Sequence, residues 1–450
     1  MSVPRPTTLF ESVLYPFKKI VGYFSGLNGI IPPGTGYVLL VLLVVAVVAA
    51  AVLSATKQPN ITSTENSQLQ AFRPAYGSLA LTRKGLGDYL TVPAVQASNA
   101  NWVLLNFAPL TCWNAGYLGP YMNGVYSTDA LRLSLDLGFR CFVFHIDHYT
   151  GNPKTGFPLP KTPCLLHRDS MGVLRSVNAG DIGAMMRVLD EQAFSPSLHT
   201  GSDPLIVILD FKNTPDPVNN PTEYKTFLTT VSKAIQPLRR TVLTKLGESQ
   251  FNGLANQNLL FTQNFQSLQK KTLIFTNANT DCFLKATDGS KPEENLRSMI
   301  HAQVYTTSGG VIPNDTVTQA APSGTQLAVG RQTDTYFLQS PADRVNDMTS
   351  KTNNVYTYTD IDQASSATYT NLSKEDQGTL LTKFGVQMVP YNVFSTPEET
   401  SKMLDTWGTY SWKLKPPTLQ YIVQRTVPPA QLSKKADAAG GNVSPPPLNL

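Results

Sequence analysis

The sequence has few charged residues, and its positive charges are scattered. Only 15% of the 450 residues are Asp, Glu, Lys or Arg, and the formal net charge is +5. A nucleic-acid-binding surface gathers Lys and Arg on one face or in one run, and the chain contains no dense cluster of them. The composition therefore argues against a nucleic acid as a partner.

Cysteine is equally sparse. The four cysteines, Cys112, Cys141, Cys164 and Cys282, stand singly, without a C-x-x-C pair. Zinc sites that can be recognised in a sequence depend on such pairs, so we do not expect a structural zinc ion. Four cysteines in a chain of this length are compatible with buried thiols or with one or two disulfides, and they do not decide the redox compartment.

One long hydrophobic run is present. Residues 37–55 contain no charged side chain, and about 20 apolar residues at ~1.5 Å per residue cross the ~30 Å hydrocarbon core of a bilayer. The run predicts a transmembrane helix, and the alternative is a cleaved signal peptide with an unusually long leader. Arg5, Lys18 and Lys19 precede it, which favours an N-inside, single-pass anchor with the remaining chain on the exterior or luminal side.

The rest of the chain divides by composition. Residues 1–36 carry apolar side chains at helical spacing and predict an amphipathic helix on a membrane surface or, alternatively, a tail with chance periodicity. Residues 56–100 predict a polar linker, and residues 101–415 predict the folded domain. Within that domain, the Thr-, Ser-, Gln- and Asn-rich residues 303–372 predict a polar insertion. The Pro- and Gly-rich residues 416–450 predict a disordered tail.

Apolar runs and helical patterns alternate within the folded domain. Such alternation predicts an α/β fold with a parallel sheet or barrel. Residues 127–137 fit both a helix and a strand, and we choose the helix because parallel strands need a crossover between them. The predicted strands are 101–107, 139–147, 163–167, 204–211, 271–276 and 384–394, and the predicted helices are 127–137, 178–194, 222–246 (broken near Pro237) and one that starts at Pro397.

The strand at 139–147 ends in polar residues. It is apolar until His145 and Asp147, and side chains alternate faces along a strand, so these two point the same way at its carboxyl end. In a β/α barrel, the carboxyl ends of the strands carry the active site. This strand therefore predicts where the functional site lies.

Several motifs follow one another in the order found in a known family. These blocks are Trp113 to Leu118, Asp129 to Val143, Leu165 to Arg168, Ile208 to Asn213 and Gly385 to Phe394. In them the sequence resembles the phosphatidylinositol-specific phospholipase C superfamily of phosphodiesterases, and the resemblance implies a distorted TIM (β/α) barrel.

The resemblance also implies a mechanism, for which the matching positions are mostly changed. The family uses one histidine as general base and a second as general acid, and its eukaryotic members bind Ca²⁺ through Asn and acidic residues. Carried across, His167 is the second histidine and Asn114 the family's Asn, whereas Trp113 stands at the first histidine. Val143, His145 and Lys212 stand at acidic positions, so most ligands for Ca²⁺ are missing.

Two hypotheses of different classes follow. The first is a membrane-anchored barrel that has lost its chemistry and acts as a binding or structural module, for example for a phospholipid head group or a glycan that stacks on Trp113. The alternative is an active, divergent phosphoric diester hydrolase. Its catalytic residues would be His145 as base and His167 as acid, Asn114, Trp113, Arg168 and Lys212 would contact substrate, and Asp147 and Asp210 would be the carboxylates left for a metal ion.

Overall fold

A computed structural model describes residues 61–98, 102–119, 124–149, 163–168, 172–242, 260–283, 291–306, 327–360 and 371–422. Among these residues, no helix is both long and apolar enough to cross a membrane. The predicted transmembrane helix at 37–55 and the predicted amphipathic helix within 1–36 lie outside the described residues.

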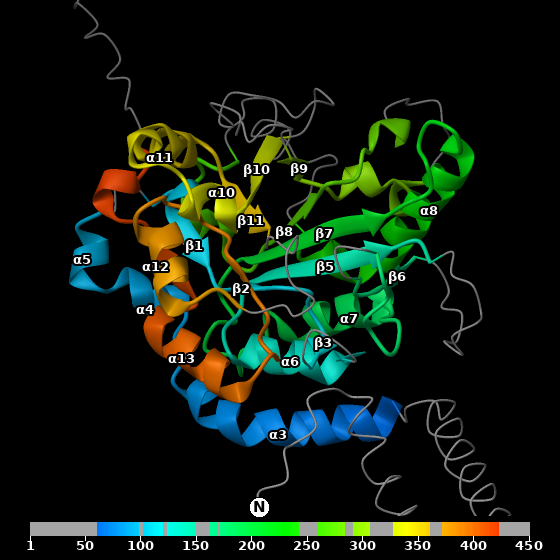
Figure 1. The fold of residues 1–450 in the computed structure, drawn as a ribbon, viewed down its shortest axis with the longest axis horizontal. Coiled ribbons are helices and arrows are strands. Elements are labelled where there is room, and N and C mark those ends of the chain that lie inside the picture. Colours follow the sequence, from blue (N-terminus) through cyan, green and yellow to red (C-terminus); the bar gives the residue numbers. More distant parts are fainter. Residues whose placement is uncertain are drawn as a thin grey trace, which may run out of the picture. The chain divides into compact units, whose positions relative to one another are not determined.

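A ring of parallel strands forms the centre of the fold (Figure 1). Each strand pairs in parallel with the next, in the order β11-β10-β9-β8-β7-β5-β2-β12. A parallel bridge between Tyr358 and Met388 joins the two ends of this row, so the described strands close into an eight-stranded barrel. The strands are β2 (Thr111–Cys112), β5 (Cys141–Asp147), β7 (Leu205–Asn213), β8 (Thr272–Thr276), β9 (Ala302–Thr306), β10 (Leu327–Thr333), β11 (Thr357–Asp360) and β12 (Pro390–Tyr391).

Helices connect successive strands outside this ring. Strands and helices alternate as expected of a TIM barrel, except between β8 and β9, where the described residues contain only 3₁₀ turns. Residues 307–326, between β9 and β10, lie outside the described residues. The α-helices that follow barrel strands are α6 (Thr128–Asp136), α7 (Ile182–Gln192), α8 (Pro221–Ala234), α10 (Asp334–Leu338), α11 (Val345–Asn354), α12 (Lys374–Thr382) and α13 (Pro397–Trp407).

Residues 127–137, which fit two patterns, form a helix as predicted. The Ser127 side chain accepts hydrogen bonds from the backbone amides of Asp129 and Ala130 and so caps the start of α6. Gly138 follows the helix at φ +85°, a conformation that a glycine adopts without strain. The cap at Ser127 and the glycine that ends the helix therefore outweigh the strand-like alternation of apolar residues in this segment.

Two predicted strands do not belong to the barrel. Residues 101–107 contain a 3₁₀ turn and the start of β1 (Phe107–Pro109), which pairs antiparallel with β13 (Trp412–Leu414). The apolar side chains of this segment pack with the barrel interior, so their hydrophobicity reflects burial and not membership of the sheet. Residues 163–167 contain the two-residue strand β6 (Cys164–Leu165), which pairs antiparallel with β5 and lies outside the row of barrel strands.

The predicted polar insertion at 303–372 is corrected by the structure. It contains most of β9 and all of β10 and β11, which complete the barrel. These strands carry Thr, Gln, Gly and Arg at many positions, so they lack the continuous apolar run by which a buried parallel strand is recognised. Residues 307–326 and 361–370 of this region lie outside the described residues.

The predicted linker at 56–100 is also corrected. It contains α3 (Ile61–Leu81), α4 (Leu86–Leu90) and α5 (Pro93–Gln96). Helix α3 packs against α13 and α6, and its Tyr76 hydroxyl donates a 2.6 Å hydrogen bond to the Val393 carbonyl (Figure 1). At the other end, the predicted tail begins with a 3₁₀ turn at Pro417–Leu419, and residues 423–450 lie outside the described residues.

The docking of α3 can be tested at Phe72. Its buried ring lies 5.3 Å from the Phe394 ring and 5.5 Å from the Tyr76 ring. Replacing a buried Phe by Ala lowers the free energy of unfolding by about 3–5 kcal/mol. Phe72→Ala should therefore clearly lower the urea concentration at the midpoint of unfolding. The exposed Gln70→Ala in the same helix should change stability by less than about 0.5 kcal/mol. Equal midpoints for the two variants would show that α3 is not part of the folded unit.

Candidate functional site

Polar side chains gather inside the barrel at the carboxyl ends of its strands. In β5, Cys141 and Val143 pack in the interior cluster, whereas Phe142 and Phe144 pack in the cluster under the outer helices. Because side chains alternate, His145 continues the interior row. In β7 the same alternation brings Asp210 and Lys212 inward, and His145 pairs in register with Asp210. The predicted location of the site is therefore occupied by these residues.

Asp210 is the centre of a buried ion cluster. Its carboxylate lies 2.7 Å from the Lys212 ammonium, 3.0 Å from an Arg331 guanidinium nitrogen and 3.8 Å from Nε2 of His145. The amide of Asn277 donates a further hydrogen bond of 2.9 Å to it. Arg331 also pairs with Asp360, which lies 3.7 Å from Lys212. Two cations and two carboxylates from β7, β10 and β11 thus neutralise one another.

The pKa values of Asp210 and His145 are both lowered, but for different reasons. Burial alone would raise the pKa of Asp210, but Lys212 and Arg331 outweigh burial and hold it well below its usual value. Burial, followed by the charge of Lys212, lowers the pKa of His145 well below its usual value. His145 is therefore a neutral and weakly basic imidazole at physiological pH.

Trp113 occupies the space beside both candidate histidines. Its indole ring lies 5.2 Å from the His145 ring and 5.0 Å from the His167 ring, edge-on to each. Trp113 is 1% exposed and His167 is fully buried. An indole this deeply buried has no free face on which a head group or glycan could stack, contrary to the sequence-based hypothesis for Trp113.

Asn114 is held in an uncommon backbone conformation beside Trp113. It has φ +45°, and its side-chain carbonyl accepts a 2.8 Å hydrogen bond from the Tyr126 hydroxyl. Its side-chain amide is buried and has no hydrogen-bond partner among the described residues. Leaving a buried donor unsatisfied costs free energy, so the side-chain amide of Asn114 destabilises the fold at this place.

Asp147 and Arg168 form a second, separate pair. The Arg168 guanidinium donates to both carboxylate oxygens of Asp147 at 2.7 and 3.2 Å. This bidentate geometry satisfies the two charges mutually. The roles predicted for these residues, substrate contact for Arg168 and metal binding for Asp147, stay predictions.

The described side chains of the barrel mouth do not fit a calcium ion. Ca²⁺ takes six to eight oxygen ligands, several of them carboxylates. Within the described residues, no group of three or more His, Cys, Asp or Glu side chains could hold a metal ion. A cation beside Asp210 would also meet Lys212 and Arg331, which already neutralise that carboxylate.

Sequence reasoning missed several residues of this site. Arg331 and Asp360 lie in the segment that was taken for an insertion, and Asn277 follows β8. The signal for Arg331 was present in the short run Leu327-Ala-Val-Gly, whose inward-facing Val329 is two residues before it. Two tyrosines of the site carried no distinguishing pattern: Tyr117, whose ring lies edge-on to His167, and Tyr126, which donates a hydrogen bond to Asn114.

Neither a protein-family model nor a curated protein sequence matches the chain. Solved structures do. PLC21 from L. pealei has 15% identity and a TM-score of 0.49 over 72% of this chain and 38% of that protein. A calcium-dependent phosphoinositol-specific phospholipase C from Pseudomonas sp. has 12% identity and a TM-score of 0.37, over 71% and 97%.

A putative glycerophosphoryl diester phosphodiesterase from Silicibacter pomeroyi has 11% identity and a TM-score of 0.34, over 68% of this chain and 96% of that protein. These neighbours are of the phospholipase C-like phosphodiesterase superfamily that the sequence resembles. The chain spans less than two-fifths of the length of PLC21. The barrel architecture itself follows from the chain's own ring of parallel strands.

The ion cluster makes a testable contribution to stability. Arg331→Met should destabilise the fold by about 3–5 kcal/mol near neutral pH, because it leaves the buried charge of Asp210 only partly compensated. Folded-state Asp210 has a lowered pKa, so its stabilisation is present above the ordinary carboxyl pKa of about 3.9 and is lost as pH falls below it. The difference between the two proteins should therefore shrink below about pH 4.

Urea unfolding at several pH values measures this difference. Arg240→Met is the control, because Arg240 pairs with Asp190 at the protein surface and its loss should change stability little at any pH. A deficit for Arg331→Met that matches the control, or that does not depend on pH, would contradict the role given to the ion cluster.

Proposed function

We propose that the chain is a membrane-anchored barrel of the phospholipase C-like phosphodiesterase fold that has lost acid–base catalysis and acts as a binding or structural module. The observation that supports this most is the position of Trp113. The indole stands where the resemblance requires a general base, and it contacts both imidazoles that could replace that base.

The acid–base chemistry fails at more than one step. Each general acid or base contributes about 10²–10⁴-fold to rate, and an indole cannot accept the proton. His145 is a poor substitute, because its lowered pKa makes it a weak base and the Trp113 ring covers it. Lys212 at an acidic position removes a further ligand of the cation that the family uses.

The residues that remain favour a structural or protein-binding role over the capture of a head group. Lys212 is the most exposed cation of the ion cluster, at 31% of its side chain, yet it is paired with Asp210. The cations of the mouth are thus already paired with the chain's own carboxylates. A partner that binds this mouth would have to offer more than one negative charge, or contact the rim around it.

The second candidate is an active phosphodiesterase with His145 as base and His167 as acid. One observation favours it: both imidazoles contact the same indole ring, so they lie near each other at the barrel mouth. The test below separates the two candidates.

Vesicles of phosphatidylinositol and of phosphatidylcholine test for lipid cleavage. We expect the unchanged chain to release no more head group than the His167→Ala variant does, with and without Ca²⁺. The reason is that the indole of Trp113 cannot act as a base. An added bacterial phosphoinositide-specific phospholipase C confirms that the phosphatidylinositol vesicles are cleavable. Release by the unchanged chain well above that of His167→Ala would replace this proposal by the second candidate.

Membrane anchoring through residues 37–55 is a separate part of the proposal. A charge-free run of this length supports it. We expect the full chain to stay with membranes during extraction at alkaline pH, and a variant that lacks residues 37–55 to be released. Release of the full chain would exclude a transmembrane anchor, and cleavage near residues 49–51 would favour the signal-peptide alternative.

A further inference from the structure

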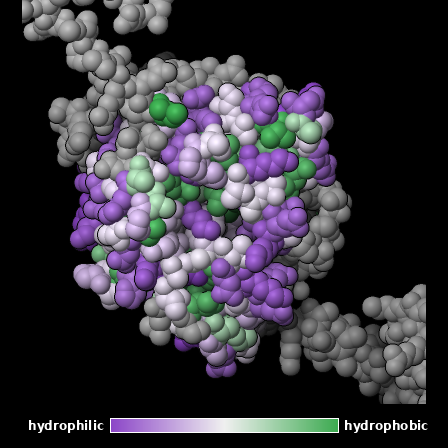
Figure 2. Space-filling view, turned by 90° about the vertical axis from the view of Figure 1, so that its left-hand side faces the viewer, coloured by the Kyte–Doolittle hydropathy of each residue, from purple (hydrophilic) through white to green (hydrophobic). Residues whose placement is uncertain are grey.

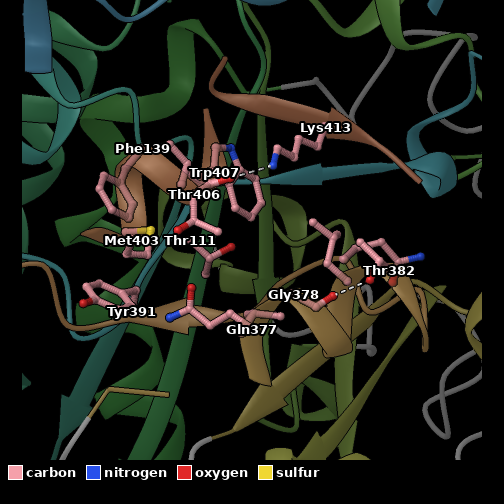
Figure 3. A pocket seen from close by; sticks show the side chains of 14 residues that line it. Thr111, Phe139, Gln377, Gly378, Thr382, Tyr391, Met403, Thr406, Trp407 and Lys413 are labelled. Atoms are coloured by element: carbon pink, nitrogen blue, oxygen red, sulfur yellow. Dashed lines mark hydrogen bonds between the residues drawn. The ribbon is translucent and has the colours of Figure 1, made fainter. Parts of the chain in front are cut away.

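A cavity of about 180 Å³ lies outside the barrel, between α12 and α13 and against β2 and β12. It is separate from the ion cluster and from the two histidines, none of which lines it. Figure 2 shows the side of the molecule that carries these helices, where hydrophobic residues surround a hollow near the centre. Figure 3 shows side chains from both helices around an open space.

The walls of the cavity are effectively apolar. Phe139, Leu381 and Met403 contribute hydrocarbon and sulfur to it. The threonines that also line it turn their hydroxyls to backbone carbonyls, as Thr382 does to Gly378 at 2.7 Å and Thr406 does to Lys402 at 2.8 Å. A ligand in the cavity would therefore meet few free polar groups apart from one end.

Gly378 keeps this space open. It lies inside α12, where glycine costs about 0.5–1 kcal/mol relative to alanine. No packing requires it, because a Cβ built at Gly378 would meet no atom within 4 Å. Gly378 lines the cavity and has open space beside it, so a longer side chain at this position has room to enter the cavity.

Lys413 supplies the polar end of the cavity. Figure 3 shows it at the edge of the space beside Trp407 and Thr406. Its ammonium lies 5.1 Å from the Trp407 ring and donates one long hydrogen bond, of 3.4 Å, to the Thr406 carbonyl. Within the described residues, no carboxylate lies within 4.0 Å of it.

The charges around Lys413 favour an incoming anion. An ammonium has three donors, and Lys413 uses one of them poorly. Arg83 is near enough to lower the pKa of Lys413, in addition to the larger effect of burial. Since burial and a neighbouring cation both destabilise the charged form, an anion at this place would relieve a cost that the fold already bears.

We propose that this cavity binds a small amphipathic carboxylate, with its apolar body between α12 and α13 and its carboxylate at Lys413. Size supports a ring or a short alkyl chain, because an apolar cavity of about 150 Å³ accommodates benzene. The proposal assigns a ligand site outside the barrel mouth and does not depend on whether the mouth has lost its chemistry.

The test uses 4-ethylbenzoate and the uncharged 4-ethylbenzyl alcohol as probes, with binding to the full chain measured by calorimetry. We expect saturable binding of the carboxylate at one site. A hydrogen bond to a charged group contributes about 1.5–3 kcal/mol, so Lys413→Met should weaken binding of the carboxylate roughly tenfold or more and leave binding of the alcohol nearly unchanged.

Gly378→Leu should abolish binding of both probes by filling the cavity. Gly77→Leu is its matched control, since Gly77 also lies within a helix and has equally open space around it. If Gly378→Leu does not fold, Gly378→Ala replaces it, because alanine favours the helix. Its methyl group should weaken the binding of both probes measurably. Absence of saturable binding, or binding that Gly378→Leu leaves unchanged, would overturn the proposal.

Discussion

The compensation of the Asp210 charge is the constraint on which the barrel mouth depends. A carboxylate this deeply buried is tolerated only if cations and donors surround it, and here they come from different strands: Lys212 from its own strand β7, Arg331 from β10, and Asn277 after β8. Arg331 in turn holds Asp360 at the end of β11. The ion cluster therefore ties together strands that are far apart in the sequence.

The same arrangement sets the charge at the barrel mouth. Lys212 and Arg331 are side chains of the chain itself, and they neutralise Asp210. Trp113 occupies space at the mouth, because its ring lies against His145 and His167 where a substrate group would otherwise approach them. Side chains of the chain itself thus neutralise the charge at the mouth and occupy the space beside its histidines.

The sequence predicted the parts of the fold that rest on strong local patterns. The continuous apolar runs of β5 and β7 and their polar ends located the site, and Ser127 with Gly138 gave the helix α6. Strands β9 to β11 were not recognised, because their short segments carry Thr, Gln, Gly and Arg and lack the continuous apolar run of a buried parallel strand. Arg331, a central member of the site, was missed for the same reason.

The closure of the barrel has a consequence for its local dynamics. Among the described residues, strand β11 meets the β12 segment at one bridge, between Tyr358 and Met388. Beside it, the side chain of Gln387 accepts a hydrogen bond from the Thr357 amide and donates one to the Leu105 carbonyl. Local opening of a native protein begins where few hydrogen bonds must break. Amide hydrogens at this seam should therefore exchange with solvent before those between β5 and β7, through partial separation of the ring while the rest of the barrel stays folded.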